Sequence, residues 1–312
     1  FSRMNQMANT AREGEPSILE ISKLVPSLLP KDIDLLTNSR ENSIILIGKT
    51  NTDTVFGYKY LQVGDKTQQQ AWFKWKLNNP LLYHFIINDE YFFVDTDNFL
   101  QIIQSDDDPI IIRSEDLSFQ IHLDNHTTVS GGSYNAATNL TTFSNVSWLS
   151  NVTTPNYQLV IIDEGGTPAP TDGQGRYAKC TVSGTSFTVP GDWQGITVTI
   201  GYLYEYLVEF PRIYPKKQEG ERSRADVNSS LIVHRIKLHF GKIGLYETTL
   251  TRVGKDDYTE VHESTAMDSY AASRVPYLEE DIKTIPVYEK NHNVDITLKS
   301  SHPAPATLRA MA

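Results

Sequence analysis

The feature that most constrains the fold is a period-two alternation of apolar and polar residues, which recurs in short runs from Ser43 onward. In the run RIKLHF, residues 235–240, Ile236, Leu238 and Phe240 alternate with Arg, Lys and His. Successive side chains of a β-strand point to opposite faces of its sheet, so this alternation predicts half-buried strands. Short Asn, Asp and Gly segments between the runs predict turns. The chain is therefore expected to be all-β.

The first 42 residues depart from this pattern. Residues 17–24 and 32–36 space their apolar residues in a more helical way, with prolines between them. We expect short helices there, within an irregular lead-in over residues 1–42. The strands expected next cover residues 44–47, 54–61, 72–77, 82–87, 91–95, 100–104 and 110–113.

A weak internal repeat lies within residues 43–123. The runs at 44–48 and 55–61 are echoed at 91–95 and 99–103, an offset of about 47 residues. Blades of a β-propeller contain four strands and repeat at roughly 40 to 50 residues, so this region is interpreted as one to two propeller-like blades. Two copies also fit a plain β-meander. A complete propeller needs about four blades, so the others would have to come from outside this sequence.

Composition divides the rest of the chain. Residues 124–200 contain only seven charged residues and are dominated by Thr, Ser, Asn and Gly. This predicts a small polar β-domain over residues 124–204, of barrel or sandwich type. Long alternating strands then return with the charge, so residues 205–312 are expected to form a C-terminal β-unit that packs on the propeller. The strands expected in the polar domain cover residues 157–162, 177–182, 187–189 and 196–200.

The net charge of −10 restricts the partners of the chain. Binding to nucleic acid requires clustered Lys and Arg, and the sequence has no basic run beyond Lys216 and Lys217. An acidic surface past which DNA slides is compatible with this charge. The single cysteine, Cys180, excludes an internal disulfide and fits folding in a reducing cytoplasm. The ends, at Phe1 and Ala312, suggest a piece of a longer protein.

The sequence contains no pattern that predicts catalysis or a bound metal. His234 and His239 are five residues apart in an alternating run, which places them on opposite faces of a strand. Residues 95–106 begin like a calcium loop but carry Leu100 where the loop needs glycine. Cys180 has no neighbouring histidine to activate it. We therefore expect no enzymatic activity, no cofactor and no metal site.

Several motifs together resemble a known family. Residues 53–75 contain YKY, GDK, QAW and a second tryptophan, and PGDW at 190–193 is followed by VTIGY at 198–202. RIKLHF, GLYETTLTR and VDITLKSSHPAPATL follow in order. The set resembles the tail tubular protein B family, the tail nozzle proteins of T-seven-like short-tailed bacteriophages (podophages). The chain is similar to the C-terminal portion of a family member, and the polar region matches poorly outside its last dozen residues.

The resemblance implies a structural protein of the virion tail that is assembled in the cytoplasm of the bacterial host. Six copies would form a homohexameric ring below a dodecameric adaptor, tail tubular protein A. This nozzle would help to attach the tail fibres. Its lumen would be the conduit for genome ejection, through which viral DNA passes without sequence-specific binding, together with the internal core proteins.

The resemblance also gives the aromatic residues a mechanical role. If residues 72–77 form a strand, Trp75 belongs to the core, and Trp72 stands on the opposite, lysine-bearing face. There its indole is either available to another surface or covered by a loop of the same chain. Aromatic residues are enriched at interface centres. The candidate interface or packing residues are Tyr58, Tyr60, Trp72, Trp75, Trp193 and Tyr202.

Two alternatives stay open at the level of sequence. A phage tail protein that binds or cleaves host surface glycans would show exposed Tyr and Trp beside paired carboxylates in a groove. A β-propeller scaffold of cellular origin would share the fold without the tail partners.

Overall fold

All the elements of the computed structural model are β-strands in the residues that it describes, which confirms the all-β prediction. The described residues are 2–6, 16–20, 29–38, 40, 42–50, 52–63, 66–77, 79–103, 110–113, 118–147, 149, 158–163, 175–219, 222–263, 275 and 277–312. Within them, no helix is long and apolar enough to cross a membrane. The chain divides into two compact units, unit 1 (Phe1–Asp108) and unit 2 (Pro109–Ala312).

The predicted short helices near the N-terminus are wrong where the structure describes them. Strand β2 (Pro16–Glu20) pairs with β1 (Ser2–Gln6), and Ile33–Asn38 forms strand β3. β3 pairs with its neighbour along its whole length, so cross-strand pairing and burial outweigh the helical spacing of its apolar residues. Residues 21–28, which include the rest of the first predicted helix, lie outside the described residues.

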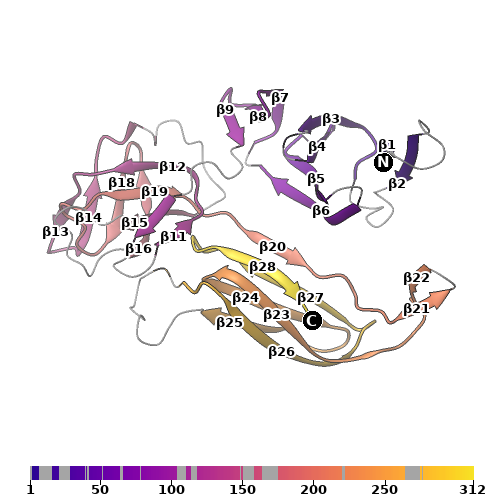
Figure 1. Ribbon diagram of the computed structural model, residues 1–312. Helices are drawn as coiled ribbons and strands as arrows, with labels where there is room; N and C mark the ends of the chain where they lie inside the picture. The colour runs from indigo at the N-terminus through magenta and orange to yellow at the C-terminus, as the bar shows by residue number, and fades with distance from the viewer. Residues whose placement is uncertain are drawn as a thin grey trace. The chain divides into compact units, whose positions relative to one another are not determined.

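Unit 1 contains two antiparallel meanders, with strand orders β3-β4-β5-β6 and β7-β8-β9 (Figure 1). Their strands beyond β3 are β4 (Ser43–Gly48), β5 (Thr54–Val63), β6 (Lys66–Lys76), β7 (Leu81–Ile87), β8 (Glu90–Asp95) and β9 (Leu100–Ile103). All coincide with predicted strands. The echoed runs become β4 and β5 in the first meander and β8 and β9 in the second. They are thus the second and third strands of each, which gives the repeat a structural basis.

The two meanders share one hydrophobic core. Ile45, Ile47 and Val55 from the first pack with Tyr91 and Phe93 from the second. A four-stranded antiparallel meander is what one propeller blade requires, whereas the second sheet has three strands. Every sheet in the described residues is open, so the predicted propeller is not shown and becomes a proposal below.

The first part of unit 2 is a β-sandwich of two four-stranded antiparallel sheets, β12-β19-β15-β16 and β13-β14-β18-β17. These strands are β12 (Asp124–Val129), β13 (Ser133–Asn135), β14 (Leu140–Phe143), β15 (Leu159–Asp163), β16 (Tyr177–Lys179), β17 (Thr181–Ser183), β18 (Ser186–Pro190) and β19 (Val198–Tyr202). The predicted strand 177–182 is in fact two strands, because the chain crosses between the sheets at Cys180. Phe143, Phe187 and Trp193 lie in the core between them.

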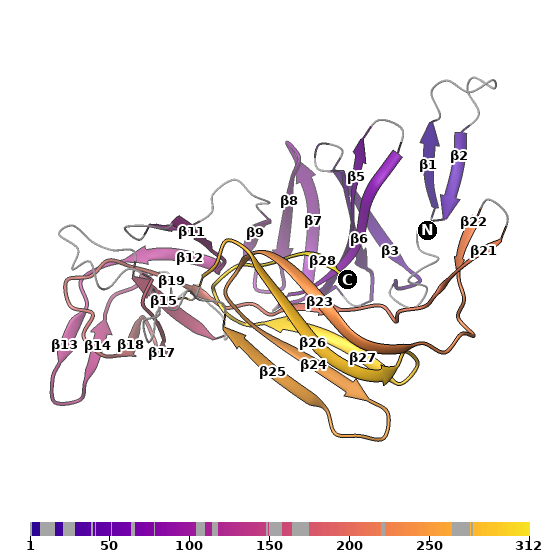
Figure 2. The same ribbon diagram turned by 60° about the horizontal axis from the view of Figure 1, so that its bottom comes forward.

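The second part of unit 2 is another sandwich, with strand orders β20-β27-β24-β25 and β26-β23-β28 (Figure 2). The strands are β20 (Tyr206–Glu209), β23 (Ile232–Ile243), β24 (Leu245–Arg252), β25 (Tyr258–Glu263), β26 (Asp281–Lys290), β27 (Val294–Ser300) and β28 (Ala306–Met311). Ile236, Leu238 and Phe240 are buried in its core, as their alternation predicts. Two hairpins complete unit 2, β10 (Ile110–Arg113) with β11 (Ser118–Ile121) and β21 (Lys216–Glu219) with β22 (Arg222–Ala225).

A third core joins the two sandwiches of unit 2. Val160 and Ile162 on the outer side of β15 pack with Leu203, Tyr277 and residues of the connecting segments. Since the other side of β15 faces the first sandwich core, all of its residues are buried. This explains the unbroken apolar run LVII, which is typical of a strand covered on both faces.

Candidate functional site

An aromatic cluster covers one face of the ladder between β5 and β6. Trp72 lies opposite Tyr58 in the register, with ring centroids 4.9 Å apart. Tyr60 stacks on Tyr58 at 5.8 Å, and the Tyr58 hydroxyl donates a hydrogen bond to Gln70 Oε1 at 2.8 Å. Such cross-strand pairs stabilise a sheet. Tyr58 is buried, whereas Tyr60 and Trp72 are half-buried and present part of their rings to solvent.

Trp75 and Phe73 lie on the opposite face of β6 and pack against the core of unit 1. Their ring centroids are 4.7 Å apart. The structure therefore confirms the predicted alternation, with Trp75 inward and Trp72 on the other face. Phe73 lies opposite Gly57 in the register, and a Cβ atom added to Gly57 would be 2.0 Å from the Phe73 ring. The glycine is required for this close approach of ring to backbone.

Trp193 forms a tight corner in the first sandwich. Its indole Nε1 donates to the Pro190 carbonyl at 2.8 Å, and its backbone N–H donates to Thr141 Oγ1 at 3.0 Å. The Thr141 hydroxyl in turn donates to the Gly191 carbonyl at 2.7 Å, and Gly191 has φ of 88°. The Arg176 guanidinium carbon lies 3.8 Å from the ring centroid. The PGDW motif is thus a structural corner, with every polar group of the buried indole satisfied.

Tyr202 and Cys180 lie in the same sandwich core. Burial, with a smaller effect of Cys180, raises the pKa of Tyr202 to about 12. Burial also raises the pKa of the Cys180 thiol, which keeps the thiol protonated and unreactive. Tyr202 and Trp193 make packing contacts inside their own unit. A contact of any candidate aromatic residue with a second chain stays a proposal.

A large apolar face, which sequence reasoning missed, lies on the outer side of the β7-β8-β9 sheet. Phe85 and Phe92 stack there at 5.2 Å. Tyr83, Leu100 and Ile102 are exposed by 64%, 57% and 49%. The outer face of β7–β9 is defined here by Tyr83, Phe85, Ile87, Phe92, Val94, Leu100 and Ile102, with Glu90 at its end. Because LLYHFII and YFFVD are apolar at odd and even positions alike, they are typical of a sheet covered on both faces.

The residues that begin like a calcium loop form a turn instead. Asp95 is buried, and its Oδ1 accepts the backbone N–H groups of Asp97 and Phe99, both at 3.0 Å. Gln101 Nε2 donates to Oδ2 at 2.9 Å. These hydrogen bonds to the Asp95 carboxylate stabilise the turn between β8 and β9. Across the described part of the chain, no group of His, Cys, Asp and Glu side chains is arranged to hold a metal.

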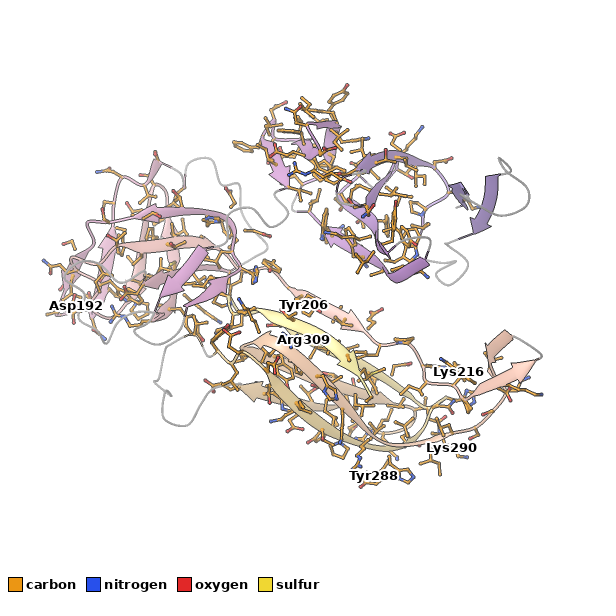
Figure 3. All side chains as sticks on the ribbon, viewed as in Figure 1. Asp192, Tyr206, Lys216, Tyr288, Lys290 and Arg309 are labelled. Carbon is orange, nitrogen blue, oxygen red and sulfur yellow. The ribbon has the colours of Figure 1, made fainter. Side chains whose placement is uncertain are left out.

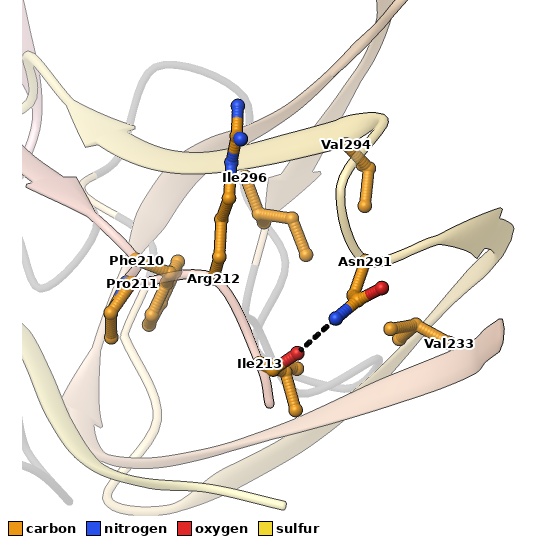
Figure 4. Close-up of a pocket in the computed structure, with 8 residues that line it drawn as sticks. All are labelled: Phe210, Pro211, Arg212, Ile213, Val233, Asn291, Val294 and Ile296. Carbon is orange, nitrogen blue, oxygen red and sulfur yellow. Dashed lines mark hydrogen bonds between the residues drawn. The ribbon is translucent and has the colours of Figure 1, made fainter. Parts of the chain in front are cut away.

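One small cavity lies beneath the segment that leaves β20 (Figure 4). Its volume is about 10 Å³, which is room for one water molecule. Asn291 lines it and donates to the Ile213 carbonyl at 2.9 Å. The Arg212 guanidinium, which forms a bidentate pair with Asp295, holds the pKa of that carboxyl below its usual value. These contacts anchor the β20 segment on the second sandwich.

Two histidines in unit 2 have perturbed ionisation, the buried His262 and the half-buried His302. Burial lowers the pKa of His302 to about 4. Burial also lowers the pKa of His262, with Lys283 acting in the same direction and Glu260 and Asp281 opposing it. His262 stacks on a buried tyrosine of β24 at 4.8 Å. Both histidines are therefore neutral in the folded protein near neutral pH.

We expect unit 2 to lose stability as the pH falls from about 6.5 toward 4, because the unfolded chain then binds protons that folded His302 and His262 do not. For His302 the full loss is on the order of 3 kcal/mol. This loss of stability is absent above about pH 6.5 and complete near pH 4. Urea denaturation at about pH 7.5 and about pH 4.5 measures it, and His302→Gln should lose less stability on acidification. Equal losses in both proteins would contradict this assignment.

Comparison with known proteins decides the family. The model of the bacteriophage nozzle protein family matches residues 1–312, which is the whole sequence. The chain belongs to the bacteriophage nozzle protein family. No curated protein sequence matches it significantly.

As a nozzle family member, the chain is a structural component of a bacteriophage tail and assembles there with other tail components. The family is a structural one and is not known for catalysis. The motifs that resemble the family have structural roles in this chain. Trp72 of QAW belongs to the aromatic cluster with Tyr58, and the following tryptophan, Trp75, packs against the core of unit 1. PGDW builds the Trp193 corner.

Proposed function

We propose that six copies of this nozzle protein form a ring below the tail adaptor, and that the lumen of the ring is the distal conduit for genome ejection. The observation that carries this proposal is the match of the nozzle family over the whole sequence. In this proposal the ring also helps to attach the tail fibres, passes viral DNA and the internal core proteins, and is assembled in the cytoplasm of the host. We also propose that the chain divides into four parts over residues 1–42, 43–123, 124–204 and 205–312.

The charge of the chain supports a conduit. Six copies at −10 each would carry about −60. A lumen of that sign repels the DNA backbone and avoids the multiple phosphate contacts that would slow its passage. In the described residues some basic side chains form ion pairs with acidic ones, as Lys299 does with Glu205 and Lys255 with Glu289.

The outer face of β7–β9 supports assembly through stacked β-sheets. The first meander packs one face on the second. On its other face Leu46 and Tyr58 are buried, and Tyr60 and Trp72 are half-buried. On the outer face of the second meander, Tyr83, Leu100 and Ile102 are largely exposed. In a propeller each blade packs on both neighbours. We therefore include in the proposal that the first meander is a propeller blade and the second a three-stranded part of one, and that a further β-meander covers the outer face of β7–β9 in the assembled nozzle.

Charge placed on the outer face of β7–β9 should block assembly without unfolding the protein. Leu100→Lys combined with Ile102→Lys adds cations at two side chains that are already largely exposed, so little packing is lost. Desolvating them in an interface costs several kcal/mol, and the assembled fraction should fall at least about tenfold. Native mass spectrometry with tail components measures this fraction.

Val253→Lys is the matched control, because Val253 is 71% exposed in the turn after β24 and lies in unit 2. It should assemble as the unmodified protein does. Normal assembly of the double variant would exclude this face from the interface, while the family membership would stand.

A further inference from the structure

A hairpin that belongs to neither sandwich of unit 2 lies between β20 and β23. Among the described residues its strands, β21 and β22, pair only with each other, and Figure 1 and Figure 2 show it beyond the end of the second sandwich. We call residues 216–225 the basic arm, because KKQEGERSRA has four basic and two acidic residues in a chain of net charge −10. An isolated two-stranded hairpin is only marginally stable in water, so the arm is expected to gain stability from a partner.

The base of the arm is fixed to the second sandwich. The backbone N–H of Asp226 donates to the Pro215 carbonyl at 2.9 Å, which closes the arm where it begins and ends. Asn291 is buried in the β26–β27 turn and donates to the Ile213 carbonyl before the arm. Its Oδ1 accepts the backbone N–H of Leu231 after the arm, at 3.1 Å. One side chain thus holds both chain segments that carry the arm.

Strand β25 is an edge strand without the features that usually protect one. It is the last strand in the order β20-β27-β24-β25, so one side of its backbone has no strand partner among the described residues. β25 contains no proline, lysine or register shift, and Tyr258 and Val261 are exposed by 42% and 60%. An edge of this kind is a template for pairing with another strand.

The other three edges of the second sandwich are protected. β20 is only four residues long. β26 contains Pro286 and has a register shift against β23. β28 has two register shifts. Short strands, prolines and bulges all hinder the addition of a further strand, so β25 is the edge of this sandwich that best accepts one.

The basic arm and the β25 edge are complementary in charge and lie at opposite edges of one sheet. Residues 256–263 contain four acidic residues and no lysine or arginine, and the lowered pKa of His262 keeps it neutral near neutral pH. The arm follows β20, which is the edge strand opposite β25. When a surface and its complement lie on opposite sides of one chain, they produce head-to-tail contacts between copies, and such contacts can close into a ring.

We infer that the basic arm of one copy docks along β25 of the next copy and adds a strand to its sheet. Backbone hydrogen bonds along the edge supply affinity, and basic residues of the arm beside Glu260 and Glu263 select the partner. DNA could match the charge of the arm but would leave the β25 edge unpaired, whereas a second copy of this chain matches both. The contact rests on the ring proposed above and identifies a surface that closes it.

Charge reversal on each side tests the contact by native mass spectrometry of the full chain with the tail adaptor. The arm variant is Lys216→Glu with Lys217→Glu, at two exposed residues (Figure 3 labels Lys216). Lys217 lies opposite Arg224, so the variant places opposite charges across the hairpin and favours its folding. The edge variant is Glu260→Lys with Glu263→Lys. Each variant alone brings like charges together, and its assembled fraction should fall at least about fivefold.

An equimolar mixture of the two variants should assemble again. The acidic arm of the arm variant meets the basic edge of the edge variant, and their unmodified surfaces meet each other. Six is an even number, so a ring with three alternating copies of each variant should form at close to the yield of the unmodified protein. This recovery would also show that both variants are folded.

Lys237→Glu with Lys290→Glu is the matched control for the arm variant, since it changes the charge equally at two exposed lysines of the other sheet. It should assemble as the unmodified protein does. Normal assembly of either variant alone, failure of the mixture to recover, or an equal loss in the control would overturn the inference and leave a ring of the unmodified protein standing. An unmodified protein that forms no ring would contradict both the proposed function and this contact.

Discussion

Trp193→Ala should lower the free energy of unfolding of unit 2 by about 3 to 5 kcal/mol. The substitution leaves a large cavity in the first sandwich core, because Trp193 is only 2% exposed. It also removes the donor to the Pro190 carbonyl and the ring beneath Arg176. Urea denaturation measures the loss, and hydrogen exchange at the β19 amides assigns it to this sandwich.

Trp72→Ala is the matched control for Trp193→Ala. It removes the same side chain from a half-buried position on the surface of a sheet, where the ring makes its described aromatic contact with Tyr58. Its cost in the isolated chain should be less than half as large, roughly 1 to 2 kcal/mol. Similar losses for both variants would contradict the distinction between a core corner and a surface ring.

Gly57→Ala should destabilise unit 1 by about 2 to 3 kcal/mol, which is large for a single methyl group. The added carbon would lie 2.0 Å from the Phe73 ring, and that ring is held between β5 and the shared core of the meanders. Either the ring or strand β5 must move. Urea denaturation with hydrogen exchange in β5 measures the effect.

A double-mutant cycle isolates the cause. In a Phe73→Ala background the ring is gone, and Gly57→Ala should then cost less than about 1 kcal/mol. An undiminished cost in that background would mean that the glycine is needed for a reason other than the approach of Phe73.

Local alternation was enough to predict most of the strands. β6 and β23 each bury one face, so their period of two is visible in the sequence. Residues 32–36 were predicted as a short helix from the spacing of their apolar residues, whereas Ile33–Asn38 forms strand β3. Its state is decided by pairing with β4, which lies beyond any local window. Likewise β16 and β17 belong to different sheets. Only Cys180 lies between them, so the sequence has no turn motif from which the crossing between the sheets could be predicted.

The aromatic residues could be found from the sequence, but their surroundings could not. Trp193 depends on Thr141, which precedes it by 52 residues, and such a contact leaves no local pattern. The outer face of β7–β9 did leave a signal, because its runs have apolar residues at odd and even positions alike. That signal was interpreted only as consecutive strands. It also predicts a sheet that packs against other parts of the structure on both faces.

Native mass spectrometry of the protein, alone and with the tail adaptor, together with electron microscopy of the same samples, tests the conduit most directly. The account predicts a closed assembly of six copies with a central channel, formed by the protein alone or when the adaptor is added. A protein that stays monomeric with every tail component would contradict it.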